Sequence, residues 1–224
     1  MTRDAYDFID YAMGYDKTKR FPLFVKPAKK VTVKAVADVM RDHYEGTPMD
    51  MTADIGAGGN ALPYRWRPMT FEVDGKTYMN ERAIATQQTG FWFVGQSRGW
   101  LPDTIGSLVW FGCDDAATSY LTPVYVSTYE VPESFRCGNG NMLTYSPTSA
   151  FWMCNRVANA CYKMYNVMAP DVRAKADAWE HMQMEKIPEI DAQALELWKR
   201  HKTDLAGVSP GMTRKGRSPI LMLQ

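Results

Sequence analysis

The sequence predicts one layered domain of the α+β class, and three observations lead to that prediction. Apolar residues between Val33 and Tyr44 recur at helical spacing. The dipeptide Asp74-Gly75 separates two short alternating runs, which is a strong local signal of a β-hairpin. From Pro147 onward the pattern becomes helical again. Because the order is helix, strands and then helices, with no linker between two cores, we expect a single α+β domain.

Composition excludes several classes of function. The 224 residues suffice for an ordinary core, and 46% hydrophobic with 23% charged residues is typical of a globular protein. A net charge of +1 gives no electrostatic reason to expect a nucleic acid or an anionic membrane as a partner. No apolar run approaches the roughly 20 residues of a membrane span, and the N-terminus lacks the pattern of a signal peptide. The compartment stays open.

The four cysteines are Cys113, Cys137, Cys154 and Cys161. None has CxxC spacing and none stands with histidines at ligand spacing, so we expect neither a zinc site nor a disulfide framework. Cys154 and Cys161 are seven positions apart in a helical pattern, which predicts that both pack on one face.

The first clear helix is predicted to begin after Thr32, a plausible N-cap, and to end at Gly46, where a C-cap glycine would stand. A short amphipathic helix at 5–15 and an extended segment at 21–27 precede it. The sequence Asp42-His43-Tyr44-Glu45 ends this helix. Its polar residues allow a ligand set or an acid/base pair, but we favour His43 as a residue of the last turn that suits the helix dipole.

Residues 51–67 are predicted to be an irregular loop near a cleft, because Gly56, Gly58 and Gly59 allow unusual backbone conformations. A phosphate-binding loop is disfavoured, since neither of its glycine motifs is present. After the hairpin at 70–79, two runs at 91–94 and 108–111 read as strands too apolar to face water. Pro123 indicates an edge strand or a strand end.

The last third of the chain is predicted to be helical. We expect helices at 147–168, 170–186 and 188–202, each started by a proline. Residues 206–224 are rich in Gly, Pro, Ser and basic residues and are predicted to be a disordered or divergent tail.

A candidate site lies between Asn80 and Tyr125, where polar residues follow the two apolar strands. Its charged members are Arg82, Arg98, Asp114 and Asp115. Such a set suits a small zwitterion, with an arginine holding a carboxylate and an aspartate holding an ammonium group. The alternative is that Arg98 pairs with Asp103, or Arg82 with Asp114, as structural ion pairs. The motifs GxSxG, HExxH and SxxK are all absent, so no nucleophile is evident.

Several unusual motifs nevertheless occur together and in order between residues 20 and 180. They are Arg41-Asp42-His43-Tyr44-Glu45-Gly46-Thr47, Glu81-Arg82-Ala83-Ile84, Gln96-Ser97-Arg98-Gly99-Trp100-Leu101-Pro102-Asp103, Trp110-Phe111-Gly112-Cys113-Asp114-Asp115-Ala116-Ala117-Thr118 and Ser149-Ala150-Phe151-Trp152. By these motifs the chain resembles bacterial dipeptidases of the dipeptidase A type, which are cysteine N-terminal-nucleophile hydrolases.

The resemblance implies a four-layer αββα sandwich with antiparallel sheets. It also implies that dipeptides are hydrolysed by an N-terminal cysteine, which forms an acyl-enzyme and needs no metal or organic cofactor. Arg82, Arg98 and Asp114 become the candidates for contacting the substrate or for supporting such contacts.

One departure changes the expectation, because none of the four cysteines is N-terminal. We therefore expect residues 1–205 to be the C-terminal portion of one dipeptidase domain, inactive alone. Its partners would be a dipeptide substrate and an N-terminal catalytic half, with a homo-oligomer left open. The alternative is a non-catalytic remnant that binds dipeptides or is only structural. Half of a layered fold would leave one sheet face uncovered and rich in exposed apolar area.

Overall fold

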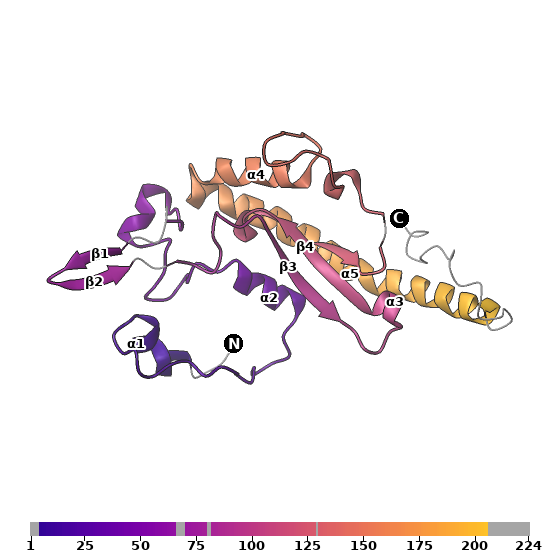
Figure 1. The fold of residues 1–224 in the computed structure, drawn as a ribbon, viewed down its shortest axis with the longest axis horizontal. Coiled ribbons are helices and arrows are strands. Elements are labelled where there is room, and N and C mark those ends of the chain that lie inside the picture. The colour runs from indigo at the N-terminus through magenta and orange to yellow at the C-terminus, as the bar shows by residue number, and fades with distance from the viewer. Residues whose placement is uncertain (1–4, 66–69, 80–81, 129, 206–224) are drawn as a thin grey trace.

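The computed structural model describes residues 5–65, 70–79, 82–128 and 130–205 and has mixed helix and antiparallel sheet, as the α+β class requires. Figure 1 shows a three-stranded sheet lying along a long C-terminal helix. Asn80 and Glu81 of the predicted site, and the predicted tail 206–224, lie outside the described residues.

The N-terminal part holds a 3-10 turn, η1 (Ala5–Phe8), a short helix, α1 (Ile9–Ala12), and then α2 (Val33–Met40). Thr32 caps α2 as predicted, because its hydroxyl accepts a hydrogen bond of 3.1 Å from the amide of Ala35. The predicted end at Gly46 is wrong. The Asp42 carboxylate accepts from the amide of Tyr44 at 2.6 Å, and such a local bond competes with continued helix.

A 3-10 segment, η2 (Ile55–Asn60), lies within the predicted irregular loop. Next, β1 (Thr70–Val73) and β2 (Lys76–Met79) form the predicted hairpin. Asp74 and Gly75 have φ angles of 50° and 70°, which are the left-handed conformations that a tight hairpin of two turn residues requires. This prediction is confirmed, and all eight strand residues are exposed.

The main sheet consists of β3 (Phe91–Ser97), β4 (Ser107–Cys113) and β5 (Thr122–Tyr125), all antiparallel, in the order β3-β4-β5. The short helix α3 (Asp103–Gly106) connects β3 to β4, and the 3-10 turn η3 (Ala116–Thr118) leads into β5. Pro123 lies in the edge strand, as predicted, where its missing N–H breaks no ladder.

Side chains of β3 alternate between the two faces of the sheet. Trp92 and Val94 are buried, whereas Phe91 and Phe93 are 62% and 54% exposed. The prediction that this whole run is too apolar to face water is therefore wrong, because successive residues of a strand point to opposite faces.

Two helices complete the chain after the 3-10 turn η4 (Glu133–Phe135), and their boundaries differ from the predicted ones. Helix α4 (Ala150–Cys161) begins later and ends earlier than the predicted 147–168. Helix α5 (Tyr165–Leu205) is one element that continues through Pro170 and Pro188, so the predicted breaks there are wrong. Core packing by residues on both sides of Pro188 explains the continuity, because Ile187 and Ala194 are both buried in the main cluster.

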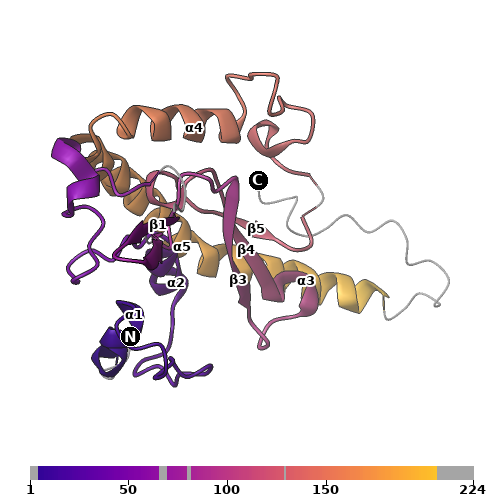
Figure 2. The same cartoon turned by 60° about the vertical axis from the view of Figure 1, so that its left-hand side comes forward.

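The core lies between one face of the sheet and helices α2 and α5. Its cluster joins Ala37 of α2 to Trp92, Leu108 and Trp110 of the sheet and to Ile187 of α5. Figures 1 and 2 show α5 running beside the sheet, with α4 folded back from its beginning.

Among the described residues, the opposite face of the sheet is covered near the end of β4, where α4 packs. There Cys113 contacts Ala150 and Cys154, with Phe111 and Phe135 at the margin. Cys154 and Cys161 are both buried, which confirms their predicted packing role. In the described residues no second sheet stacks on this face.

Candidate functional site

Asp114 directly follows β4 and is held in a strained conformation. Its φ angle is 66°, and its amide donates to the carbonyl of Gly90 at 2.9 Å. The side chain is buried at 5% exposure. Its Oδ1 atom accepts a long bond of 3.5 Å from Asn155, and among the described residues Oδ2 has no partner. Burial, with the neighbouring charge of Asp115 as a further cause, raises the pKa of Asp114 to about 6. This carboxyl group can accept a proton or a cationic ligand.

Asp115 differs from its neighbour, because both of its carboxylate oxygens accept hydrogen bonds from within the fold. It is fully buried and accepts hydrogen bonds from the amide of Ala117 at 3.0 Å and from the hydroxyls of Tyr64 and Tyr162. These partners come from η3, from the loop before β1 and from the turn after α4. Asp115 therefore ties three distant segments together around the end of β4.

His43 is buried at 1% exposure and lies beyond the end of α2, so the prediction that it belongs to the last helical turn is wrong. Its Nδ1 atom lies 2.9 Å from Glu45 Oε1, and Nε2 lies 3.1 Å from the Tyr64 hydroxyl. Burial disfavours the charged form of Glu45, but hydrogen bonds from His43 outweigh it and hold the pKa of Glu45 at about 2. Glu45 is thus a carboxylate that accepts from Nδ1.

The second hydrogen bond of the His43 ring is to the Tyr64 hydroxyl. The Tyr64 hydroxyl donates to Asp115, so it must accept from Nε2 of His43. Burial and the charge of Asp115 raise the pKa of Tyr64 well above its usual range, which keeps this hydroxyl protonated.

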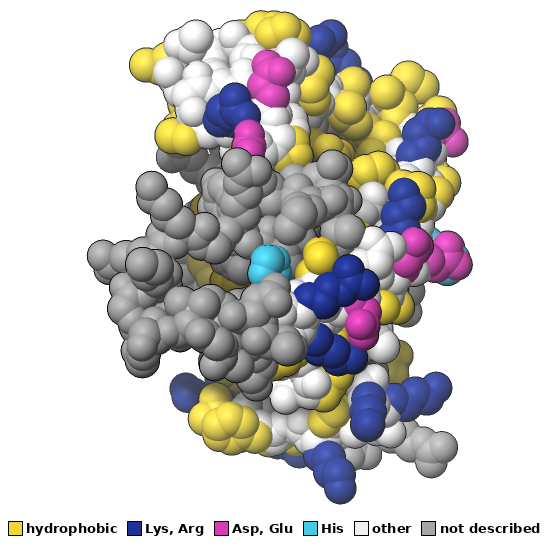
Figure 3. Space-filling model, turned by 90° about the vertical axis from the view of Figure 1, so that its right-hand side faces the viewer, with side chains coloured by type: hydrophobic (Ala, Val, Ile, Leu, Met, Phe, Trp, Pro, Cys, Tyr) yellow, Lys and Arg dark blue, Asp and Glu magenta, His cyan; other side chains and the backbone are white. Residues whose placement is uncertain are grey.

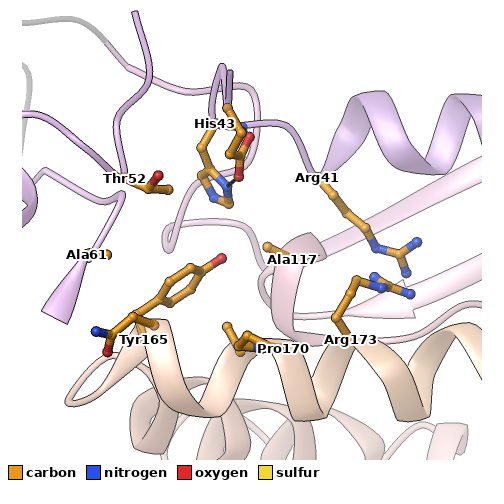
Figure 4. Close-up of a pocket in the computed structure, with 11 residues that line it drawn as sticks. Arg41, His43, Thr52, Ala61, Ala117, Tyr165, Pro170 and Arg173 are labelled. Carbon is orange, nitrogen blue, oxygen red and sulfur yellow. Dashed lines mark hydrogen bonds and ion pairs between the residues drawn. The ribbon is translucent and has the colours of Figure 1, made fainter. Parts of the chain in front are cut away.

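A pocket of about 380 Å³ opens beside this network (Figure 4). Figure 4 shows the Tyr165 hydroxyl and the His43 ring facing the same space, with the guanidinium groups of Arg41 and Arg173 together at the other end. The first turns of α5 form one wall, and Thr52 and Ala61 of the 41–61 segment form another.

The two arginines at the end of the pocket have different surroundings. Arg41 is buried and fully bonded, to the carbonyls of Ala116 and Ser119 and to both carboxylate oxygens of Glu180. Arg173 bonds Asp177 at 3.0 Å through Nη2. Its Nε and Nη1 atoms are buried and have no partner among the described residues.

Arg98 is buried at the end of the β3–β4 ladder opposite to Asp114, and its guanidinium is bonded to other residues of the chain. It forms an ion pair with Asp191 of α5 and donates to the carbonyl of Ile105 at 2.6 Å. The predicted structural alternative named Asp103 as its partner, and the structure places Asp191 there instead. Whether Arg98 also contacts a substrate stays a prediction.

Arg82 is exposed, and its guanidinium donates to Thr86 and Gln88 rather than to Asp114. The register pairs Phe91 with Cys113 and Ser97 with Ser107. Arg98 and Asp114 therefore lie at opposite ends of the β3–β4 ladder, about 20 Å apart at ~3.4 Å per residue. The predicted residues do not form one cluster.

None of the four cysteines is prepared as a nucleophile. Burial raises the pKa of Cys113 to about 11 and that of Cys154 to about 12, and it also raises the pKa of Cys161. A reactive cysteine needs the opposite shift, because the thiolate is the attacking form. Cys137 is exposed, and no hydrogen bond of the described residues joins it to a histidine.

Comparison with known families shows to which family of proteins the chain belongs. A family model described as peptidase family C69 matches residues 8–178, which is more than half of the chain. The chain belongs to peptidase family C69. It is therefore a member of a family of peptidases, which are hydrolases, as the resemblance to dipeptidase A predicted. Searches of curated proteins and of solved structures found no match.

The C69 match spans the Asp114 turn, the His43 network and the beginning of α5. Among the residues that the structure describes, no three His, Cys, Asp or Glu side chains are grouped to hold a metal ion. Within the described ranges, no helix combines the length and the apolar character that a membrane crossing requires.

Proposed function

We propose that this C69 chain is the C-terminal portion of a dipeptidase that works through a cysteine acyl-enzyme. A thiol outside this chain's four cysteines attacks the carbonyl carbon of the dipeptide, and the α-amine of that cysteine takes the thiol proton. The C–N bond breaks, the proton passes to the leaving amine, and water then hydrolyses the thioester. The observation that carries the proposal is membership of a peptidase family by a chain whose three buried thiols are unsuited to attack.

Asp114 supports the proposal as a candidate for substrate contact. An ammonium group placed against Oδ2, which has no partner among the described residues, would supply a hydrogen bond and favour the charged carboxylate. A dipeptide carries such a group at its N-terminus. Arg82 is exposed enough to meet the substrate carboxylate, while Arg98, held by Asp191, supports the sheet on which the site is built.

The uncovered sheet face supports the remaining part of the proposal, a four-layer sandwich completed by an N-terminal half. Phe91 and Phe93 of β3 project from this face with more than half of their surface exposed. A second sheet packed there would bury them. The alternative is a non-catalytic remnant of the same fold, and the raised pKa values of Cys113, Cys154 and Cys161 suit that alternative equally well.

A complementation assay separates the two proposals. The purified chain is incubated with a panel of dipeptides, alone and with a Cys-led N-terminal half of a C69 peptidase. We expect no hydrolysis by the chain alone and hydrolysis in the mixture, lost when the leading Cys is changed to Ala. Hydrolysis by the chain alone would show that its own residues include the nucleophile. Failure of every cognate half to restore activity, despite stable association, would favour the non-catalytic remnant.

A further inference from the structure

A second pocket, of about 420 Å³, lies between α4 and α5, beside the segment that leads into β5. None of the residues that line it takes part in the proposed chemistry. We propose that this pocket binds an unbranched monocarboxylic acid of medium chain length, with the alkyl chain inside and the carboxylate at Lys175. The inference goes beyond the proposed dipeptidase function and does not depend on it.

Apolar side chains of both helices form the interior of the pocket. Cys154 of α4 and Ala176 of α5 line it and are buried, and the half-buried Met153 and Val172 line it from the same two helices. Burial of apolar surface is favourable and has no directional requirement, and methionine adapts its shape to its neighbours. This lining therefore suits a flexible alkyl chain.

An aromatic pair forms another wall of the pocket. The rings of Tyr120 and Trp179 meet edge to face, with centroids 5.9 Å apart, and the indole N–H of Trp179 donates to the carbonyl of Leu121 at 3.2 Å. These contacts hold the indole in place, so the wall is formed before a ligand arrives. Trp179 and Val157 are still 38% and 40% exposed, and an alkyl chain in the pocket would cover part of that surface.

Lys175 supplies the charge that selects the ligand. It lines the pocket and is exposed, so its methylene stem borders the apolar interior while its ammonium group stays in water at the mouth. In the part of the chain that the structure describes, Lys175 forms no ion pair, and Asp171, one helical turn earlier, is not within ion-pair distance. The other described residues that line the pocket are uncharged. One cation at the mouth of an apolar pocket matches an apolar molecule with one carboxylate.

The size of the pocket sets a limit on the length of the chain. Its volume lies in the lower part of the range of known small-molecule sites. Affinity should rise about fourfold with each added methylene group until the chain fills the space. Longer acids should then gain nothing further.

Isothermal titration calorimetry on the full chain tests the proposal with hexanoate, octanoate and octan-1-ol as probes. We expect octanoate to bind at one site, roughly 10-fold more tightly than hexanoate and about two- to fivefold more tightly than octan-1-ol. Lys175→Gln should remove the preference for octanoate over octan-1-ol and leave the affinity for octan-1-ol unchanged. Lys186→Gln, which changes an exposed lysine of the same helix outside the pocket, is the matched control and should alter neither affinity.

A second pair of variants tests where the chain binds. Val172→Phe places a larger side chain in the pocket, and we expect it to weaken octanoate binding at least ~10-fold. Val167→Phe makes the same change at a position of α5 that is exposed and outside the pocket, so octanoate should bind as it does to the wild type.

Four results would overturn the proposal. They are octanoate binding that does not saturate at one site, equal binding of octanoate and octan-1-ol by the wild type, equal weakening of octanoate by the two lysine substitutions, and unchanged binding in a folded Val172→Phe variant. Circular dichroism shows whether that variant folds. If it does not, Val157→Phe, at the partly exposed rim, replaces it and is judged by the same outcome. Because no hydrolysis is measured, failure here leaves the complementation assay unaffected, and the reverse also holds.

Discussion

Asp114 combines a strained backbone with a buried carboxyl group, and both features oppose folding. A non-glycine residue with a φ angle of 66° is uncommon, and aspartate and asparagine tolerate it best. The group binds its proton more tightly in the folded chain, since its pKa is about 6 against an ordinary 3.8. Stability therefore falls as the pH rises from about 4 to about 6.

The substitution Asp114→Asn keeps the shape and removes the charge. We expect it to raise the free energy of unfolding at pH 7 by about 1 to 2 kcal/mol, allowing for solvent screening, and to have a much smaller effect at pH 4. Urea titrations of both proteins across this range measure the difference. A variant whose free energy of unfolding changes equally at both pH values would contradict the assignment of the destabilisation to the buried charge.

Glu180 lies at the centre of a buried charge cluster. It accepts from Arg41 Nη2 at 2.5 Å and from the amide of Leu121 at 2.9 Å. Glu180→Ala would leave a buried guanidinium without its counter-ion, and we expect a loss of about 3 to 5 kcal/mol.

The control for that change is Glu185→Ala on the same helix. Glu185 is exposed and pairs with His181 at 3.1 Å on the surface, so its loss should alter the free energy of unfolding by less than about 1 kcal/mol. Urea denaturation of both variants provides the measurement. Similar losses from the two substitutions would show that burial of the Arg41–Glu180 pair has no special weight.

The residues of these networks could not be assigned from the sequence, because their partners are far away in the chain. Tyr64 reaches Asp115 across 51 positions, and Arg41 reaches Glu180 across 139. His43 was predicted to lie in the last turn of a helix, because it stands at the end of a helical pattern. That local position does not indicate that His43 is buried beside Tyr64. The family resemblance included the Arg41–Thr47 motif but did not supply its contacts.

At the scale of elements, the sequence predicted correctly those structures that depend on a few neighbouring residues. Thr32 caps α2 and Asp74-Gly75 forms the hairpin because each depends on neighbouring residues alone. The prolines of α5 were misread because packing of the flanking turns outweighs one missing hydrogen bond. The apolar runs identified two strands correctly but could not show that only one face of the sheet would be covered.

Pro188 offers a direct test of that balance. It cannot donate to the carbonyl of Met184, so Pro188→Ala should restore a helical hydrogen bond and stabilise the chain by about 1 to 2 kcal/mol. Thermal melts followed by circular dichroism measure the change. Pro147→Ala, an exposed proline before α4, is the control and gains no helical bond. Destabilisation by Pro188→Ala would mean that the ring itself packs favourably.

At the scale of the whole molecule, the surface is unevenly apolar. Figure 3 shows the largest group of hydrophobic side chains at the upper right of this face, while several Lys and Arg side chains lie at its lower end without Asp or Glu beside them. Phe91 and Phe93 add an aromatic pair on the open face of the sheet. Exposed patches of this kind promote association.

The double substitution Phe91→Ser with Phe93→Ser should reduce self-association of the isolated chain and its binding of a hydrophobic dye. Because both side chains face outward, the melting temperature should change little. Light scattering and dye fluorescence measure the effect. Phe24→Ser is the control, since Phe24 is 87% exposed but lies outside the sheet. Equal effects of the two sets of substitutions would show that association does not depend on the sheet face.

The long separation of Arg41 and Glu180 in the sequence also has a consequence for folding during synthesis. The two residues are 139 positions apart, so the ribosome needs roughly 10 to 30 s to produce Glu180 after Arg41. Until then Trp92 and Leu108 lack the helix that covers them. The nascent chain therefore exposes its future interior from the synthesis of Leu108 until α5 is made, and a chaperone that recognises apolar segments would find its binding sites there before α5 emerges.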